Sequence, residues 1–326
     1  MTRVVLATLL LLSASVQPVF AQKPHTSSPD ALRWLQKIAA APRQHNYVGT
    51  FVYSSGNNIE TSRIVHLVDE DGEHEKSEVL DGPPREIIRN NDEMRCYLPD
   101  SKTVVTEKRW LRKVFPALLP QPLSNLDDNY VVRKGGQERV SGFLCQVIEL
   151  EPRDDKRYGQ KLWVDAHTGL LLKATVMDKG RVVEQFVFTD LKIGGKIDKE
   201  LLKSRYAAKT ADWRTTNLVS STVGSGKLGW QVEDSPPGFR KIIEMKRNLS
   251  GTSRPVGQIA LSDGLAAVSV FIEPLSGNSS PPVEGLYHSR GAISIYTRTV
   301  GDNVITTVGE VPPATVMQIG NSVTSQ

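Results

Sequence analysis

YVGTFVYSSGNNIETSRIVHLVDEDGEHEKSEVL, residues 47–80, alternates strand-forming runs with turn signals. β-Branched and aromatic residues are frequent in 47–53 and 61–68, and 73–80 follows as a third run. A Ser/Gly/Asn cluster at 54–58 and the Asp71-Gly72 pair separate these runs, as turns do. Consecutive strands joined by tight turns predict an antiparallel meander.

The strand pattern continues on the C-terminal side of this stretch. A meander of so many strands must curl or split to bury one face. We therefore predict a β-rich α+β fold whose first domain is a strongly curved antiparallel sheet. Its further strands are predicted at residues 85–89, 94–98, 103–106, 140–150, 160–165, 170–177 and 182–193.

An N-terminal helix is predicted to close this sheet. Ser28 is a suitable N-cap, and Pro29 suits the first helical position. Leu32, Leu35 and Ile38 then recur at helical spacing, so their stripe is expected to pack on the sheet.

Residues 107–127 do not continue the strand pattern. Apolar residues fall at helical spacing beside a row of cations, and prolines then prevent a long helix. This predicts a short helical lid, which either packs on the open side of the sheet or admits an anionic amphiphile. The proposed lipid-binding residues are Trp110, Leu111, Val114, Phe115 and Leu118 on the apolar side and Lys108, Arg109, Arg112 and Lys113 on the basic side.

The chain is predicted to contain two domains. Residues 211–226 are rich in Ser, Thr and Gly, which is typical of a linker. A second β-rich unit follows and ends in a helix at 314–319, so it is predicted to be a smaller α+β domain. The predicted division is a signal peptide at 1–21, a first domain at 22–210, a linker at 211–226 and a C-terminal domain at 227–326.

The N-terminus has the pattern of a secretory signal. Arg3 precedes an almost wholly apolar run at 4–12, and Val19-Phe20-Ala21 offers a cleavage site before Gln22. The apolar run is shorter than the roughly 20 residues that span a bilayer. We therefore predict export and a mature protein that is soluble outside the cytoplasm.

Export changes how the two cysteines are interpreted. An even count in an oxidising compartment favours a disulfide between Cys96 and Cys145. Such a bridge would close a loop of about 50 residues, worth on the order of 4 kcal/mol in the chain-entropy model. Two separate buried thiols are the alternative.

No residue pattern predicts an enzyme, a metal centre or a cofactor site. The histidines are scattered; His66 and His74 lie on adjacent predicted strands without a third ligand, as solvated histidines do. The carboxylate pair Asp154-Asp155 lies in a polar loop, where solvated turn residues are usual. A net charge of +4 is too small for a nucleic-acid binder.

Four motifs, in chain order, resemble the RseB/MucB family of sigma-E regulatory proteins. DGPPREII (81–88) resembles the family's D-G-P-x-R-E-[IV]-[IV] segment. Trp230 with PGF (237–239), SDGL (262–265) with VSV (268–270), and ITTVGEVPP (305–313) are the others. The ordered run of these matches extends over most of the mature chain, from residue 81 to residue 313.

The resemblance implies a fold and a function. The first domain is expected to resemble the lipoprotein carriers LolA and LolB, that is, to be a half-open antiparallel β-barrel with a helical lid. The protein is expected to act in the periplasm of a Gram-negative bacterium, where it binds the periplasmic region of an RseA/MucA-type anti-sigma factor and shields it from regulated proteolysis. A lipid-bearing signal, lipopolysaccharide or lipoprotein, is expected to release it.

Partner contacts are assigned to aromatic residues of the C-terminal domain. Trp230, Phe239 and Tyr287 are the predicted contacts because aromatic residues dominate interface energetics. The alternative is that they form the core of that domain. A lipid or lipoprotein carrier is the alternative function, and a homo-oligomer stays open.

Overall fold

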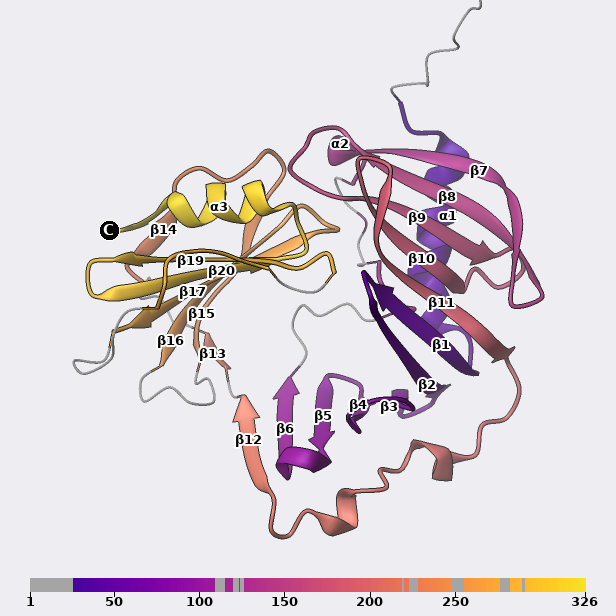
Figure 1. Cartoon of the computed structure of the whole chain (residues 1–326). Helices are drawn as coiled ribbons and strands as arrows, with labels where there is room; N and C mark the ends of the chain where they lie inside the picture. Colours follow the sequence, from indigo (N-terminus) through magenta and orange to yellow (C-terminus); the bar gives the residue numbers. More distant parts are fainter. Residues whose placement is uncertain are drawn as a thin grey trace, which may run out of the picture.

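The computed structural model describes residues 26–108, 115–119, 123, 126–218, 220–222, 228–247, 255–275, 282–288 and 291–326. Within these residues the chain forms one large and one smaller β-sheet domain, which lie side by side (Figure 1). The helices are α1 (Pro29–Ala40), α2 (Leu126–Asn129) and α3 (Pro313–Asn321), and 3-10 turns lie at Ala41–Arg43, Pro99–Ser101, Lys199–Leu202 and Ala207–Lys209.

The large sheet of the described chain has twelve strands and is not closed into a barrel, because β12 and β7 form its two edges. Every pairing is antiparallel except that of β12 with β6. The order across the sheet is β12 (Arg214–Leu218), β6 (Thr103–Lys108), β5 (Glu93–Leu98), β4 (Glu86–Asn90), β3 (Gly72–Val79), β2 (Asn58–Asp69), β1 (Tyr47–Ser55), β11 (Arg181–Ile193), β10 (Leu171–Asp178), β9 (Gly159–Asp165), β8 (Phe143–Pro152) and β7 (Tyr130–Val140).

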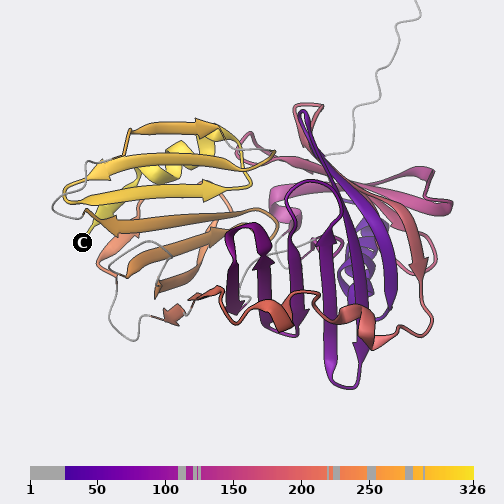
Figure 2. The same cartoon turned by 60° about the horizontal axis from the view of Figure 1, so that its bottom comes forward.

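The predicted N-terminal helix is confirmed as α1. The Ser28 side chain accepts a hydrogen bond from the backbone N–H of Ala31 at 3.0 Å, and Pro29 is the first helical residue. Ala31, Leu35 and Ile38 are buried in the core that α1 shares with the sheet, which curves around it (Figure 2).

The predicted strand at residues 140–150 is wrong in its first part. Ser141 and Gly142 both have positive φ, 48° and 84°, and reverse the chain between β7 and β8. Two consecutive positive-φ residues form the turn that matches the twist of a hairpin. Ser-Gly is a weaker signal for this turn than Asn-Gly or Asp-Gly. The sequence pattern therefore did not predict a separate strand at β7.

Residues 194–213, here called the crossing segment, run across the outer side of β2 to β6 (Figure 2). Glu86 of β4 fixes this segment. Its buried carboxylate accepts hydrogen bonds from the Ser204 hydroxyl at 2.7 Å and from the backbone N–H of Arg205 at 3.1 Å. Lys76 of β3 lies 3.3 Å from the same carboxylate and donates to the Lys203 carbonyl at 2.9 Å.

The predicted linker at 211–226 contains two strands in its described part. Residues 214–218 form β12 on the edge of the large sheet, and residues 220–222 form β13 on the edge of the smaller one. Backbone pairing with β6 and β15 holds these residues although their side chains show no periodicity. The part that the structure describes is therefore not an unstructured linker.

The smaller sheet packs against α3, which confirms the predicted final helix. A two-stranded ladder of β14 (Trp230–Val232) and β21 (Val323–Ser325) lies beside it. Across the seven-stranded sheet the order is β13 (Ser220–Thr222), β15 (Arg240–Arg247), β16 (Val256–Ser262), β17 (Ala267–Pro274), β20 (Asn303–Gly309), β19 (Ser294–Val300) and β18 (Gly285–His288).

The predicted disulfide is wrong. Cys96 lies on β5 and Cys145 on β8, with seven strands of the sheet between them, and no bridge joins them. Spacing along the chain carries no information about whether two Cα atoms come within the roughly 7 Å that a bridge needs. Burial raises the pKa of the Cys145 thiol to about 11, so it stays protonated at neutral pH.

Candidate functional site

An aromatic cluster lines the concave face of the large sheet. Phe51 of β1 and Phe186 and Phe188 of β11 point to this face because side chains two residues apart share a side of a strand. Phe115, from the segment after β6, lies against all three, with ring centroids 5.4 Å from Phe51, 5.4 Å from Phe186 and 5.1 Å from Phe188. The Phe115 side chain is 1% exposed, so it is completely buried against these three rings.

The structure describes only part of the predicted lid. Phe115 is buried, and Leu118 is partly buried against the same core. Residues 115–119 form turns rather than a helix. Lys108 is the last residue of β6, and its side chain is not described. The other predicted lipid-binding residues lie outside the described residues: Arg109, Trp110, Leu111, Arg112, Lys113 and Val114.

A buried ion pair joins the two domains. Arg157, in the β8–β9 connection, donates to Asp263 Oδ2 at 2.5 Å, and both side chains are fully buried. The other edge of the guanidinium binds Asp154 at 2.9 and 3.0 Å, and Nη2 also donates to the Pro237 carbonyl at 2.5 Å. Asp154 is thus a partner of the junction rather than a solvated turn residue.

Both oxygens of the Asp263 carboxylate accept several hydrogen bonds. Its Oδ1 accepts the backbone N–H groups of Leu265 and Ala266 at 2.8 and 2.7 Å, and its Oδ2 also accepts the Tyr130 hydroxyl at 3.2 Å. Burial and the Asp263 carboxylate raise the pKa of Tyr130, which keeps that hydroxyl a donor. Leu265 itself lies in the hydrophobic core of the first domain. The SDGL motif is therefore the part of the second domain that packs into the first.

A second contact lies near the aromatic cluster. Glu184 Oε2 of β11 accepts the Tyr53 hydroxyl at 3.0 Å and the backbone N–H of Ala292, from the second domain, at 3.1 Å. Burial and Glu184 raise the pKa of Tyr53 to about 12, so the phenol is protonated and donates. Gly291 has φ +74°, and a side chain there would collide with the Glu184 carboxylate and the Tyr53 hydroxyl.

The three predicted partner-binding aromatics do not form one surface. Phe239 is 6% exposed, belongs to the second core and lies under the Arg157 guanidinium at 5.2 Å. Trp230 packs against the same core from β14. Tyr287, on the edge strand β18, is 42% exposed, and its hydroxyl donates to the Val283 carbonyl. The core interpretation holds for Phe239; Trp230 is half-buried against the same core, and Tyr287 is the exposed one of the three.

The two strand histidines do not meet. Leu67, not His66, is the residue paired with His74, so the two rings point to opposite faces of the hairpin. His66 is fully buried, stacks on Tyr47 at 4.5 Å and bonds Glu75 and the Pro42 carbonyl through its two ring nitrogens. Burial opposes ionisation of Glu75, but Arg89 and His66 outweigh it and lower the pKa of Glu75. This group is structural rather than solvated.

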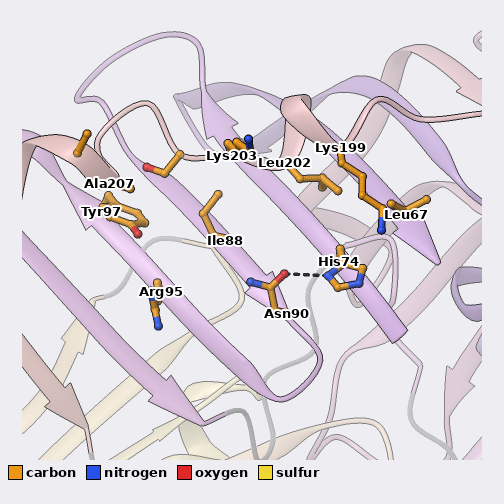
Figure 3. Close-up of a pocket in the computed structure, with 12 residues that line it drawn as sticks. Leu67, His74, Ile88, Asn90, Arg95, Tyr97, Lys199, Leu202, Lys203 and Ala207 are labelled. Carbon is orange, nitrogen blue, oxygen red and sulfur yellow. Dashed lines mark hydrogen bonds between the residues drawn. The ribbon is translucent and has the colours of Figure 1, made fainter. Parts of the chain in front are cut away.

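A pocket of about 480 Å³ lies between the crossing segment and β2 to β5 (Figure 3). Leu67, Ile88 and Leu202 give it an apolar floor, and His74 bonds Asn90 at 2.9 Å on one wall. Its cations are each neutralised by a carboxylate, which leaves no excess positive charge for a phosphate; the pairs are Lys199 with Asp69, Lys203 with Glu200 and Arg95 with Glu93.

In the described part of the chain, no group of three or more His, Cys, Asp or Glu side chains is placed to hold a metal ion. In the same residues, no helix is both long and apolar enough to cross a membrane.

Both domains match known families. The MucB/RseB N-terminal domain matches residues 30–206, and the MucB/RseB C-terminal domain matches residues 224–324. The sigma factor AlgU regulatory protein MucB of Pseudomonas aeruginosa is 33% identical over 97% of this chain and 96% of its own length. The sigma-E factor regulatory protein RseB of Escherichia coli K12 is 25% identical, over 91% and 92%.

Solved structures agree with this likeness. The complex of P. aeruginosa MucA and MucB superposes with a TM-score of 0.71 at 30% identity, over 91% of this chain and 99% of that one. A second structure, MucB in complex with MucA(peri), gives a TM-score of 0.70 at 29% identity. These comparisons define the class as that of the two-domain sigma-E factor regulatory proteins. The chain belongs to the MucB/RseB family, as its four motifs predict.

Proposed function

We propose that this protein is a periplasmic negative regulator of an envelope-stress sigma factor. It binds the periplasmic region of a MucA/RseA-type anti-sigma factor and shields it from regulated proteolysis. The observation that carries this proposal is the likeness, over both domains, to a protein solved in complex with MucA. The signal-like N-terminus supports export to the compartment where such a partner is exposed.

The exposed edge of the second domain is the proposed partner surface. Tyr287 and Val283 are 42% and 80% exposed at the β18 edge of the sheet. Tyr287→Ser is expected to weaken binding of the anti-sigma periplasmic region at least about tenfold, because exposed aromatics supply much of an interface's energy. Isothermal titration calorimetry with the full mature chain measures this.

Ile242→Ser is the matched control, since Ile242 is 45% exposed on β15, near the opposite edge of the same sheet. Equal affinity in the wild type and Tyr287→Ser would move the interface away from β18. Absence of any binding by the wild type would favour the lipid-carrier alternative. Point variants are preferable to deletion of 227–326, because Leu265 completes the first core.

The concave aromatic face is the proposed lipid site. An acyl chain that replaces Phe115 there would gain about 0.8 kcal/mol for each buried methylene. Lipopolysaccharide is therefore expected to dissociate the complex with the anti-sigma factor. Phe115→Ala is expected to lower the lipopolysaccharide concentration that releases half of the anti-sigma factor, because the competing side chain is gone. Fluorescence anisotropy of labelled anti-sigma peptide follows the release. Leu35→Ala, in the same core but on α1, controls for general loosening. An identical release curve for Phe115→Ala and the wild type would place the lipid elsewhere.

A further inference from the structure

A continuous series of contacts runs from Phe115 to the backbone of the second domain. Phe115 stacks on Phe186, with centroids 5.4 Å apart and the ring planes 10° from parallel. Phe186 packs against Tyr53 at 4.7 Å, as its cross-strand neighbour. The Tyr53 hydroxyl and the Ala292 N–H then share one acceptor, Glu184 Oε2, at 3.0 and 3.1 Å.

The shared acceptor makes the two hydrogen bonds depend on each other. Glu184 is 9% exposed, so its carboxylate has little water to replace a lost donor. The backbone of Gly291 approaches the Glu184 and Tyr53 side chains so closely that no larger side chain would fit there. Tyr53 therefore lies between Phe186, which its ring contacts, and the Glu184 oxygen that binds the Ala292 N–H.

The chain reaches the second domain again on the C-terminal side of Phe115. Leu119 and Leu126 lie in one core cluster with Leu265 of the second domain. Asn129, at the end of α2, donates to the Asp263 carbonyl at 3.1 Å. Contacts with the second domain thus follow Phe115 along the chain, at Asn129, and also reach it through the Phe186–Tyr53–Glu184 contacts.

We propose that occupancy of the aromatic cluster by Phe115 and docking of the second domain are coupled, so that a ligand with an acyl chain that displaces Phe115 also loosens the Glu184–Ala292 contact. This inference rests on the proposed function, because it gives a lipid bound in the first domain a physical route to the partner-binding domain. It assigns to Tyr53 and Glu184 the role of transmitting the change.

Hydrogen exchange of the Ala292 amide tests the coupling in the full mature chain by NMR. Phe115→Ala is expected to accelerate exchange of this amide at least about tenfold relative to the wild type. Tyr53→Phe, which removes only the hydroxyl, is expected to accelerate it as well. In a double-mutant cycle, Phe115→Ala is expected to add little once Tyr53→Phe is present.

Leu35→Ala serves as the control, because it removes a buried side chain of the same core from α1. Equal acceleration in Leu35→Ala would show general destabilisation and overturn the proposal, as would full additivity of the two substitutions. If Phe115→Ala does not fold, Phe115→Leu replaces it, because leucine keeps the apolar bulk but loses the aromatic stacking. An unchanged exchange rate of the Ala292 amide in whichever variant folds also overturns the proposal. No lipid or anti-sigma factor is present in this experiment, so its failure leaves the proposed function standing.

Discussion

Arg157→Ala is expected to separate the two domains in solution, which withdraws Leu265 from the first core while the sheets of both domains stay folded. The substitution leaves Asp263 buried without its cation, a change that costs about 3–5 kcal/mol in buried pairs. Interfaces between domains of one chain are modest and polar compared with a core. Undocking hydrates the orphaned carboxylate, so it costs less than keeping the junction closed.

Small-angle scattering and calorimetry measure this outcome. The radius of gyration is expected to rise, and thermal unfolding is expected to resolve into two transitions. Arg33→Ala removes an exposed pair with Asp30 and is expected to change neither quantity. The double variant Arg157→Met with Asp263→Leu is expected to restore docking in part, because apolar replacement of a buried pair is often neutral. An unchanged radius and a single transition in Arg157→Ala would contradict the proposed role of the pair.

Glu86→Ala is expected to detach the crossing segment from the large sheet. The buried Glu86 carboxylate binds Ser204 and Arg205, and its loss also leaves the Lys76 ammonium buried beside Glu78 with one partner fewer. Breaking such a buried cluster costs about 3–5 kcal/mol. We expect a lower free energy of unfolding and new proteolytic cleavage within residues 194–213.

Glu60→Ala is the matched control for this substitution. Glu60 pairs with Arg85 of the same DGPPREII motif, but both side chains are about one-third exposed or more, so little effect is expected. Urea unfolding and limited proteolysis of both variants make the comparison. If Glu86→Ala is as stable and as resistant to cleavage as the wild type, the crossing segment is held by its apolar contacts alone.

The local elements of the first domain could be predicted because short-range rules decide them. Ser28 and Pro29 specify the start of α1 through a cap and a fixed φ. Asp71-Gly72 specifies the turn between β2 and β3. The rules failed where the signal was weak, at the Ser141-Gly142 turn, and where backbone pairing alone holds a strand, as in β12.

The candidate site could be predicted only in outline. Phe115 was assigned to a face of the sheet from its spacing, and it is buried there. Arg157 and Glu184 were missed because a charged residue in a polar loop or on a strand has the same local pattern whether it is solvated or buried. Their partners Asp263 and Ala292 lie 106 and 108 residues away in the chain.

The sequence alone therefore determined the β-rich class, the N-terminal helix and, through its four motifs, the family. Only the tertiary structure decided that the thiols stay apart, that Phe239 belongs to the second core while Tyr287 is exposed, and that Asp263 and Glu184 fasten the second domain to the first. The reason is physical: caps, turns and periodicity act over a few residues, whereas burial and ion pairing depend on which distant segment comes to lie opposite.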